Sequence, residues 1–511
     1  MNQKWFRSLF RRRVLIALLI AVQCGFLFYL IATGSRLSAA LDQFLRLISI
    51  LVILYIISKR DKGAYKTAWI LLILTFPLFG GLFYLLFTCQ SSKKRIAKRI
   101  DQIQSQTQGL SLLPGSGYDQ ARQQMGTVFP QVRYLQDFVG YPVYQNTATT
   151  YYPTGQDMLQ GLLPQLRRAK RYIFLEFFII QEGVMWNQIL DILAQKAAEG
   201  VTVRVLYDDL GCFLKIPADF PQQLQAKGIA CYKFNPFRPF LTAMQNNRDH
   251  RKIISIDGQV AFTGGINLAD EYINAVERFG YWKDSGICLE GKAAWSLTLM
   301  FLQTWQLCTK QTEDFAAFYP WQHAPCQIPT DGFVLPYGDS PLDSENVGEH
   351  VYMQILNQAT DYVYICTPYL IVDDSMVSAL TLAAKRGVDV RILTPHIWDK
   401  RLVHMTTRSY YRELIREGVK IYEFSQGFLH AKSFVCDDRI ATVGTTNLDF
   451  RSLYLHFECG VWMYGTASVL DVKRDFLDTL PSCQQITEAD TFRHPIAKFF
   501  QECLRIFAPL M

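Results

Sequence analysis

The sequence contains one eight-residue pattern twice, as HRKIISID at residues 250–257 and as HAKSFVCD at residues 430–437. Both copies read His-x-Lys-x4-Asp, and a polar cluster follows each one, TGGIN at 263–267 and GTTN at 444–447. Residues two apart in a strand face the same side, so each His points the same way as its Lys. One His-x-Lys is compatible with an ordinary surface strand, but two copies with the same continuation indicate a shared site.

The two patterns belong to a longer repeat with an offset of about 190 residues. The corresponding strand-like runs are 172–180 with 362–366, and 201–207 with 388–393. A helical stretch that ends in glycine precedes the second run of each copy, as a left-handed helix cap requires. Alternating strands and helices predict an α/β fold. We therefore expect two tandem α/β units that pack face to face around one cleft.

The repeated polar residues suit the chemistry of a phosphate group. Ammonium and amide groups can hold phosphate oxygens, and an imidazole can act as a nucleophile or transfer a proton. Bringing the two copies together would gather His250, Lys252, Asn267, His430, Lys432 and Asn447. Neither a carboxylate cluster suited to Mg²⁺ nor a Cys/His set suited to zinc accompanies them in the sequence. We therefore expect a reaction that uses no metal and no other cofactor.

The composition points to a membrane protein with a globular portion. Charged residues make up 19% of the 511 residues, against about 25% on average, and hydrophobic residues make up 50%. A disordered chain and a single small domain are thereby excluded. Three apolar runs, at about 14–33, 37–58 and 67–88, lie in the first 90 residues, and a membrane-spanning helix needs about 20 apolar residues. Residues 1–90 are expected to anchor the chain through two to three transmembrane helices.

The charges beside these runs predict the orientation of the anchor. The net charge is +7, and basic residues cluster before the first run, between the second and third, and after the third. Such clusters favour the cytoplasmic side and an anionic membrane surface rather than nucleic acid. Pro77, Gly80 and Gly81 could turn the third run into a re-entrant hairpin that keeps all three clusters inside; a full crossing is the alternative.

The cysteines and the first run refine the predicted location. No small-x-small cleavage site follows the first run, so we expect it to be retained rather than removed as a signal peptide. The cysteines are scattered without a C-x-x-C, and several, such as Cys231, Cys366 and Cys436, lie in apolar stretches where we expect them to be buried. Free thiols fit a reducing compartment. We expect a multi-pass cell-membrane protein whose catalytic portion is cytoplasmic.

The remaining sequence divides into a linker and the two repeat units. Residues 91–130, basic at first and then rich in Gln, are expected to form the linker. The first unit is expected over 131–325 and the second over 326–511, ending in an amphipathic helix. The apolar face of that helix comprises Ile496, Phe499, Phe500, Cys503, Leu504 and Phe507. Core packing is the expectation for this face, and a position at the membrane surface is the alternative.

The duplicated motif resembles the phospholipase D superfamily, and further stretches resemble bacterial cardiolipin synthases. These stretches are NPFRP at 235–239, GGINLADEY at 264–272, TPY at 367–369 and GTTNLDFRS at 444–452. The apolar run at 69–87 and the ending APLM also fit, so the resemblance covers nearly the whole chain. Thr445 stands where Ser is commoner and His456 where Asn is commoner. We expect neither departure to touch the catalytic pair.

The resemblance implies phosphatidyl transfer from one phosphatidylglycerol to another, which gives cardiolipin and glycerol through a phosphohistidine. By analogy, His250 is the nucleophile and His430 the acid/base, while Lys252, Lys432, Asn267 and Asn447 hold the phosphate. Family members pair each His with a carboxylate of the opposite half, which implies Glu458 for His250 and Asp284 for His430. Asp257 and Asp437 complete the catalytic motifs, where we expect them to bond backbone or lysine.

Three other functions are alternatives to that of a cardiolipin synthase. A phospholipase D-type hydrolase or transphosphatidylase, using water or another alcohol, differs only in what its acceptor pocket admits. A nuclease would need the long basic–aromatic tracts that are missing after residue 100. A non-catalytic lipid-binding protein would not need intact His and Lys in both motifs. Glu176 lies in an otherwise apolar strand, so we expect it either to be paired or to lie near the site. The sequence does not indicate the oligomeric state.

Overall fold

The computed structural model describes residue 25 and residues 36–510. Inside that range, the residues left out are 60, 77–79, 89–90, 112–116, 238–242, 322–325, 327, 330 and 492–494. The chain forms two compact units. One comprises Met1–Ile96, Phe237–Asn246 and Arg505–Met511, and the other comprises Ala97–Pro236 and Asn247–Leu504. The larger unit contains the whole repeat.

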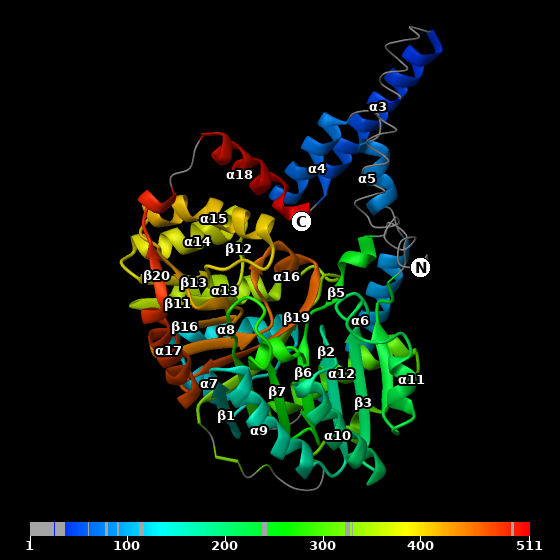
Figure 1. Ribbon diagram of the computed structural model, residues 1–511, viewed down its shortest axis with the longest axis vertical. Helices are drawn as coiled ribbons and strands as arrows, with labels where there is room; N and C mark the ends of the chain where they lie inside the picture. The colour runs from blue at the N-terminus through cyan, green and yellow to red at the C-terminus, as the bar shows by residue number, and fades with distance from the viewer. Residues whose placement is uncertain are drawn as a thin grey trace. The chain divides into compact units, whose positions relative to one another are not determined.

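The two copies of the repeat form two sheets with the same strand order (Figure 1). The first sheet runs β1 (Thr147–Tyr152), β9 (Gly286–Gly291), β7 (Val260–Gly264), β6 (Lys252–Ile256), β2 (Tyr172–Phe177), β3 (Thr202–Asp208) and β4 (Ala230–Phe234). The second runs β10 (Phe333–Asp339), β19 (His456–Tyr464), β17 (Ile440–Gly444), β16 (Ser433–Cys436), β11 (Tyr362–Cys366), β13 (Asp389–Pro395), β14 (Lys420–Phe424) and β20 (Cys483–Ile486). In both, three neighbouring strands are parallel, β2–β3–β4 and β11–β13–β14, and the other pairs along the sheet are antiparallel, including the pair of β14 with the additional edge strand β20. The predicted α/β repeat is confirmed strand by strand.

Helices connect the strands at equivalent points of the two copies. The first copy has α9 (Gly155–Arg168), α10 (Val184–Ala198), α11 (Phe220–Gln225) and α12 (Ala294–Thr309). The second has α13 (Val347–Gln358), α14 (Asp374–Lys385), α15 (Arg401–Arg416), the short α16 (Phe450–Tyr454) and α17 (Ala467–Thr479). Gly200 and Gly387 follow α10 and α14 with φ of 89° and 94°, as the predicted left-handed caps require.

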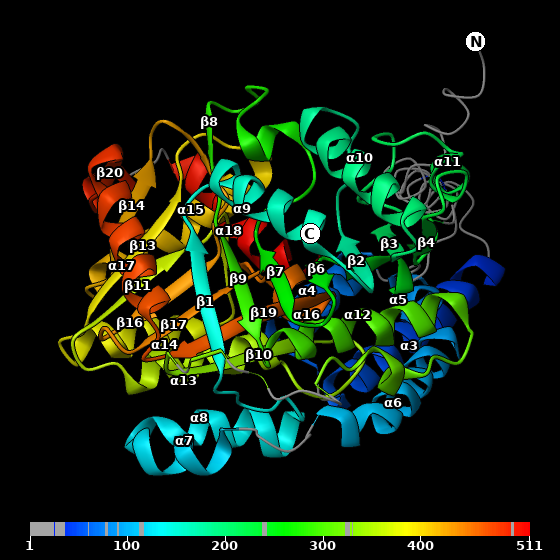
Figure 2. The same ribbon diagram turned by 90° about the horizontal axis from the view of Figure 1, so that it is seen from below.

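The two sheets pack against each other, as expected for tandem units (Figure 2). Ile253, Ala261 and Leu289 of the first sheet share one buried core with Val435 and Val461 of the second. Burying these apolar side chains is worth about 25 cal/mol per Å² removed from water. Ile253 and Val435 lie in β6 and β16, and these two strands begin just after the motif histidines. The shared core therefore fixes the position of the candidate site.

Residues 91–130, for which the sequence predicts a linker, are largely helical where the structure describes them. They contain α6 (Ser91–Ser111), α7 (Tyr118–Gln124) and α8 (Phe129–Arg133). Ile103 of α6 is buried against Trp295 and Leu299 of α12, because a narrow apolar stripe runs along an otherwise polar helix. Gln131 of α8 accepts a hydrogen bond from the Trp462 indole at 2.7 Å. The first sheet begins at β1, which precedes the first strand-like run that the sequence indicated, 172–180.

The smaller unit contains α3 (Arg36–Ser58), α4 (Gly63–Thr75) and α5 (Gly80–Thr88). The predicted run at 67–88 is two helices that pack against each other: Trp69 lies 5.1 Å from Tyr84 between ring centroids, and a Cβ on Gly80 would come within 2.7 Å of the Ile73 Cα. The run at 37–58 falls in α3, whereas the run at 14–33 lies outside the described residues apart from residue 25. In the part of the chain that is described, no helix combines the length and the apolar character needed to cross a membrane.

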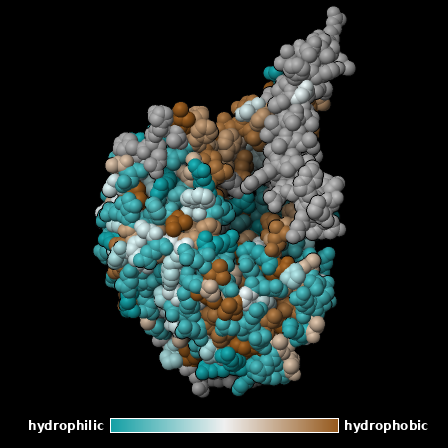
Figure 3. Space-filling model, in the orientation of Figure 1, coloured by the Kyte–Doolittle hydropathy of each residue, from teal (hydrophilic) through white to brown (hydrophobic). Residues whose placement is uncertain are grey.

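The C-terminal helix α18 (Pro495–Phe507) exposes much of its apolar face. Ile496, Phe499 and Phe500 are 64%, 67% and 59% exposed. Figure 3 shows the hydrophobic residues gathered over this helix. The expected core packing of the face is therefore wrong for these three residues, and the alternative, a position at a membrane surface, remains.

Candidate active site

Two short pairs of strands connect the halves and position both motif histidines. β5 (Arg248–Asp249) pairs in parallel with the start of β19, in the opposite half. β15 (Gly427–Leu429) pairs in parallel with β8 (Tyr281–Lys283), again across the halves. In the first pair, β5 is followed by His250, and β19 contains Glu458. In the second pair, β15 is followed by His430, and β8 is followed by Asp284. The backbone itself therefore brings each histidine to a carboxylate of the other half.

His250 is held at both its backbone and its ring. Its N–H donates to the carbonyl oxygen of Phe457 at 2.9 Å. Its ring Nδ1 lies 2.8 Å and 3.0 Å from the two carboxylate oxygens of Glu458, which is fully buried. A carboxylate at Nδ1 favours the tautomer with the proton on that nitrogen, which leaves a lone pair on Nε2. The free nitrogen is thus the one able to attack.

His430 has an equivalent arrangement with one difference. Its N–H donates to the carbonyl oxygen of Lys283 at 2.7 Å, and its Nδ1 lies 2.6 Å from Oδ2 of the buried Asp284. The same Nδ1 is also 2.7 Å from the Nζ of Lys432. A cation and a carboxylate therefore meet at one nitrogen of His430, whereas a carboxylate alone is hydrogen-bonded to Nδ1 of His250.

The two lysines are buried beside the histidines. Lys252 and Lys432 are each 1% exposed, and each ammonium donates to the carbonyl oxygen of the histidine two positions earlier. Burial lowers the pKa of Lys252 to about 8 and that of Lys432 to about 7, although neighbouring carboxylates oppose the shift. Each ammonium has three donors, so donors remain for an incoming anion.

Both histidines are neutral in this environment. Burial, reinforced by Lys252 and Lys432, lowers the pKa of His250 well below its ordinary value of 6.5. Burial and Lys432 lower the pKa of His430 to about 4, although Asp284 opposes the shift. An anionic substrate would raise both pKa values again, since it favours the charged form of a nearby base. The site is thus arranged to receive negative charge.

The two asparagines lie in equivalent places and are partly engaged. Asn267 accepts a hydrogen bond from the Ile179 N–H at 3.0 Å and donates to the Tyr272 hydroxyl at 2.7 Å. Asn447 donates to Asp449 at 3.0 Å, and its Oδ1 has no hydrogen-bond partner among the described residues. Each amide nitrogen keeps a second N–H, so either one can still donate to a phosphate oxygen.

Asp257 and Asp437 are not brought to the histidines. Each lies at the far end of the strand that starts beside the motif histidine, a span of about 16 Å. The Asp257 carboxylate accepts backbone N–H groups of residues 170–172, each at 2.8 Å. The Asp437 carboxylate accepts those of residues 360–362 at 2.8 or 2.9 Å. Both therefore tie the ends of neighbouring strands together.

Replacing either aspartate by asparagine is expected to destabilise the fold more than it slows turnover. An amide in place of a carboxylate that accepts three N–H groups is expected to lower the free energy of unfolding by about 1–3 kcal/mol. Activity of Asp257→Asn and Asp437→Asn should stay within about fivefold of wild type, since neither side chain reaches the histidines. Thermal unfolding and initial rates on the same preparations measure both effects.

The stability effect at Asp437 should depend on pH. Burial raises the pKa of this carboxyl, but hydrogen bonds from residues 362, 360 and 361 outweigh it and hold the pKa below the ordinary 3.8. A lowered pKa in the folded state stabilises the fold above the unfolded pKa, and that stability is lost as pH falls through the folded pKa. The difference in stability between wild type and Asp437→Asn should therefore shrink below pH 3.8. A constant difference down to strongly acidic pH would contradict this account.

Of the two departures that were expected not to touch the catalytic pair, His456 contacts His250, and Thr445 contacts the carboxylate that holds His250. The Thr445 hydroxyl donates to Oε2 of Glu458. The His456 ring lies 5.5 Å from that of His250 between centroids, and its Nδ1 is 3.8 Å from Oε1 of Glu458. The rule that residues two apart in a strand share a face places His456 beside Glu458, so the signal was present in the sequence.

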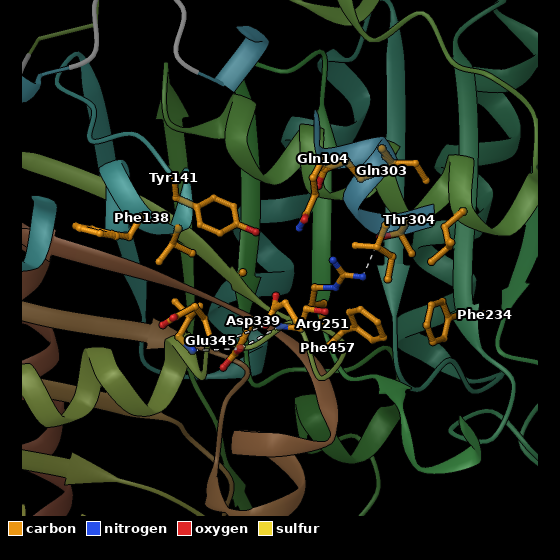
Figure 4. Close-up of a pocket in the computed structure, with 18 residues that line it drawn as sticks. Gln104, Phe138, Tyr141, Phe234, Arg251, Gln303, Thr304, Asp339, Glu345 and Phe457 are labelled. Atoms are coloured by element: carbon orange, nitrogen blue, oxygen red, sulfur yellow. Dashed lines mark hydrogen bonds between the residues drawn. The ribbon is translucent and has the colours of Figure 1, made fainter. Parts of the chain in front are cut away.

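Glu176 is paired rather than part of the site. Its carboxylate lies 2.8 Å from the Arg251 guanidinium, which also contacts Asp249 at 2.9 Å and Thr304 at 2.8 Å. Burial raises the pKa of Glu176, although Arg251 opposes the shift. Arg251 lines a cavity of about 210 Å³ that also reaches Asp339 (Figure 4). The middle residue of the first motif thus points away from the histidine pair into a separate buried network.

The chain is similar to known proteins over most of its length. The family model "Cardiolipin synthase, PLD-like domain" matches residues 162–278 and 352–480, and the model "Phospholipase D-nuclease N-terminal" matches residues 47–87. An uncharacterized protein of Streptococcus mutans is 46% identical over 90% of this chain and 99% of its own length. A cardiolipin synthase of Alkalihalophilus pseudofirmus is 34% identical over 91% of this chain and 92% of its own length.

A solved structure supports the fold. The crystal structure of phosphatidylserine synthase from Haemophilus influenzae matches with a TM-score of 0.56 and 15% identity, and it covers 75% of this chain and 98% of its own. At that identity the match concerns the fold alone. The family model matches both halves of the repeat, and the named cardiolipin synthase aligns over about nine-tenths of both chains. The chain therefore belongs to the cardiolipin synthase family of phospholipase D-like proteins.

Proposed function

We propose that this chain is a cardiolipin synthase that transfers a phosphatidyl group from one phosphatidylglycerol to another and releases glycerol. The observation that carries the proposal is the crossed pairing of two neutral imidazoles. Each is held at Nδ1 by a carboxylate of the opposite half, and each has a buried lysine beside it. This arrangement supplies one nucleophile, one acid/base and two cations around one phosphate.

In the first step, Nε2 of His250 attacks the phosphorus, and the bond from phosphorus to the glycerol oxygen breaks. His430 gives a proton to that oxygen, so glycerol leaves and a phosphohistidine remains. The Asp284 carboxylate at Nδ1 supports this assignment, because it stabilises the protonated imidazolium that gives up the proton. The negative charge of the substrate raises the pKa of His430 and so favours its protonation.

In the second step, His430 takes a proton from the glycerol hydroxyl of another phosphatidylglycerol. The resulting oxygen attacks the phosphorus, the bond to His250 breaks, and cardiolipin is released. Lys252 and Lys432 neutralise the non-bridging oxygens as charge builds up in both transition states, assisted by the remaining amide donors of Asn267 and Asn447. Nothing in these steps needs a metal or another cofactor.

The lowered lysine pKa values predict an alkaline limit for activity. Burial lowers the pKa of Lys432 to about 7, so its positive charge is lost as pH rises through that value. We expect kcat/KM, which reflects the free enzyme, to fall above about pH 7 to 8. The limit for kcat should lie higher, since a bound phosphodiester stabilises the ammonium. Rates measured from pH 5 to 10 at low and saturating substrate test this; a kcat/KM that is flat to pH 9 would contradict it.

The surroundings of the site support a lipid substrate at a membrane. In each half, a loop after the second parallel strand exposes a large apolar side chain, Leu214 at 78% and Trp398 at 48%. Leu214 has a left-handed backbone with φ of 69°, a strained conformation that holds it in solvent. The thiol of Cys212, in the first loop, donates to the backbone of Phe178, whose ring stacks edge-on against His250. The first of these loops therefore lies close to the catalytic histidine His250.

We further propose that the N-terminal runs hold the enzyme in the cell membrane with the catalytic unit in the cytoplasm. The uncharged run at 14–33 is long enough to cross a bilayer, and the packed α4–α5 hairpin fits a re-entrant segment. All ten described cysteines are free, and Cys231, Cys366 and Cys436 are buried as expected. An impermeant thiol reagent should leave them unlabelled in intact cells; labelling would contradict the cytoplasmic side.

The function is tested by incubating the purified full chain with phosphatidylglycerol in vesicles or detergent, without divalent metal. Free glycerol and a four-chain lipid should appear in equal amounts. Phosphatidic acid as the sole product would favour the alternative, a hydrolase of the phospholipase D type, and would overturn the synthase. Exchange into another added alcohol would favour a transphosphatidylase.

A further inference from the structure

His456 is a buried imidazole that the proposed reaction does not use. Its side chain is 10% exposed, and its Nδ1 lies 3.8 Å from Oε1 of Glu458. That separation exceeds a hydrogen bond, and no hydrogen-bond partner of this nitrogen is found in the described part of the chain. A buried polar atom without a partner has lost its hydration without replacement. Because His456 lies beside the His250–Glu458 pair, a ligand bound between the three side chains could provide the missing partner for this nitrogen.

Three potential metal-ligand atoms converge at this point. One atom each from His250, His456 and Glu458 lies within 4.8 Å of the other two. Around a tetrahedral zinc ion with bonds of about 2.1 Å, ligand atoms stand about 3.4 Å apart. The separations from Glu458 Oε1, 2.8 Å to Nδ1 of His250 and 3.8 Å to Nδ1 of His456, lie on either side of that value. Small side-chain rotations would bring all three to bonding distance.

The ligand types and charges favour a transition-metal ion of moderate affinity. Two imidazoles with one glutamate are a common zinc set, and the glutamate supplies a negative charge. The ammonium groups of Lys252 and Lys432, which are buried beside the two motif histidines, oppose a cation. Because these charges compete, we expect reversible binding rather than a permanent structural metal.

We propose that His250, His456 and Glu458 form an inhibitory site for zinc or a similar borderline transition-metal ion. Bound at Nδ1 of His250, the metal takes the lone pair that forms there when the proton moves to Nε2. A neutral imidazole then has no free lone pair on Nε2, so it cannot attack phosphorus. Inhibition rests on the proposed function, whereas metal binding does not. Mg²⁺ and Ca²⁺ prefer oxygen ligands and should not inhibit.

The first test compares zinc inhibition in wild type and His456→Asn, a variant that carries the residue commoner in the family. Cardiolipin formation from phosphatidylglycerol micelles is measured against Zn²⁺ concentration, each variant relative to its own rate without metal. We expect the concentration for half inhibition to rise at least about tenfold in His456→Asn, since a ligand is lost. Excess chelator should restore the wild-type rate. His350→Asn removes a partly exposed histidine that also lies 3.4 Å from a glutamate, Glu345, and should leave the response unchanged.

The second test measures binding directly and does not depend on activity. Titration of the full chain with Co²⁺, followed by visible absorption, should give the spectrum of a nitrogen-containing site in wild type and a much weaker one in His456→Asn. Equal zinc sensitivity of wild type and His456→Asn would overturn the proposal. So would a Co²⁺ spectrum that is the same in both proteins. Co²⁺ binding that depends on His456, in a protein without any synthase activity, would refute the proposed function alone.

Discussion

Replacing His250 or His430 by alanine is expected to reduce cardiolipin formation by at least about 10⁴-fold. His250→Ala removes the atom that bonds to phosphorus, and His430→Ala removes the proton donor without which the glycerol oxygen is a poor leaving group. Each change also leaves a buried carboxylate, Glu458 or Asp284, without its imidazole. The double variant should be no slower than either single variant, because the two groups act in the same steps.

Rates with phosphatidylglycerol, together with trapping of the intermediate, check this expectation. With substrate labelled at phosphorus, quenching wild type in alkaline detergent, in which the phosphorus–nitrogen bond survives, should leave label on the protein, and His250→Ala should carry none. His350→Ala is the matched control, since His350 lies outside the cleft and bonds to Tyr134. Thermal unfolding shows that each variant is folded. A His250→Ala protein that turns over within about tenfold of wild type would refute the nucleophile, and label retained on His250→Ala would move that role to another residue.

Exchanging the carboxylates for amides is expected to give the next largest loss, about 10²- to 10⁴-fold for Glu458→Gln and for Asp284→Asn. The amides keep the shape of the side chains, but their charge is gone. In Glu458→Gln, an amide N–H directed at Nδ1 of His250 would stabilise the tautomer with the proton on Nε2, the wrong form for a nucleophile. In Asp284→Asn, the negative charge that stabilises the imidazolium form of His430 is lost. We expect Glu458→Gln mainly to lower kcat, with a small change in KM, because the carboxylate acts through His250 rather than on the lipid.

The motif aspartates provide the control for these variants. Asp257→Asn and Asp437→Asn make the same chemical change on carboxylates that accept backbone N–H groups far from the histidines. They should keep most of the activity and lose stability, the reverse of the pattern for Glu458→Gln. If Asp257→Asn were as inactive as Glu458→Gln, the assignment of which carboxylates support the histidines would be wrong.

Much of the fold follows from the periodicity of the sequence. Strand-like runs, helix-ending glycines and the duplicated motif predict two α/β copies, and each predicted strand of one copy has its counterpart in the other. The rule that residues two apart share a face correctly groups each motif histidine with its lysine. These features are local, and local periodicity is what a single sequence records most directly.

The parts that the sequence did not predict depend on contacts between distant residues. His250 and Glu458 are 208 residues apart, and only the resemblance to a family suggested their pairing. The buried stripe of α6 was hidden by its polar composition until α12 was seen to cover it. The resemblance to the family identifies His456 only as a departure from an asparagine. It does not indicate which residues an imidazole at this position would contact.

The two strand pairs that cross between the halves determine the smallest unit of the protein that can be active. Because each half lends its histidine to a strand of the other, neither half contains a complete histidine–carboxylate pair of its own. A polypeptide with one copy of the motif could regain both pairs only by pairing these strands with those of a second polypeptide about a twofold axis. The chain can therefore be regarded as a dimer whose partners are covalently joined. Slight separation of its halves would abolish the chemistry while both sheets remain intact.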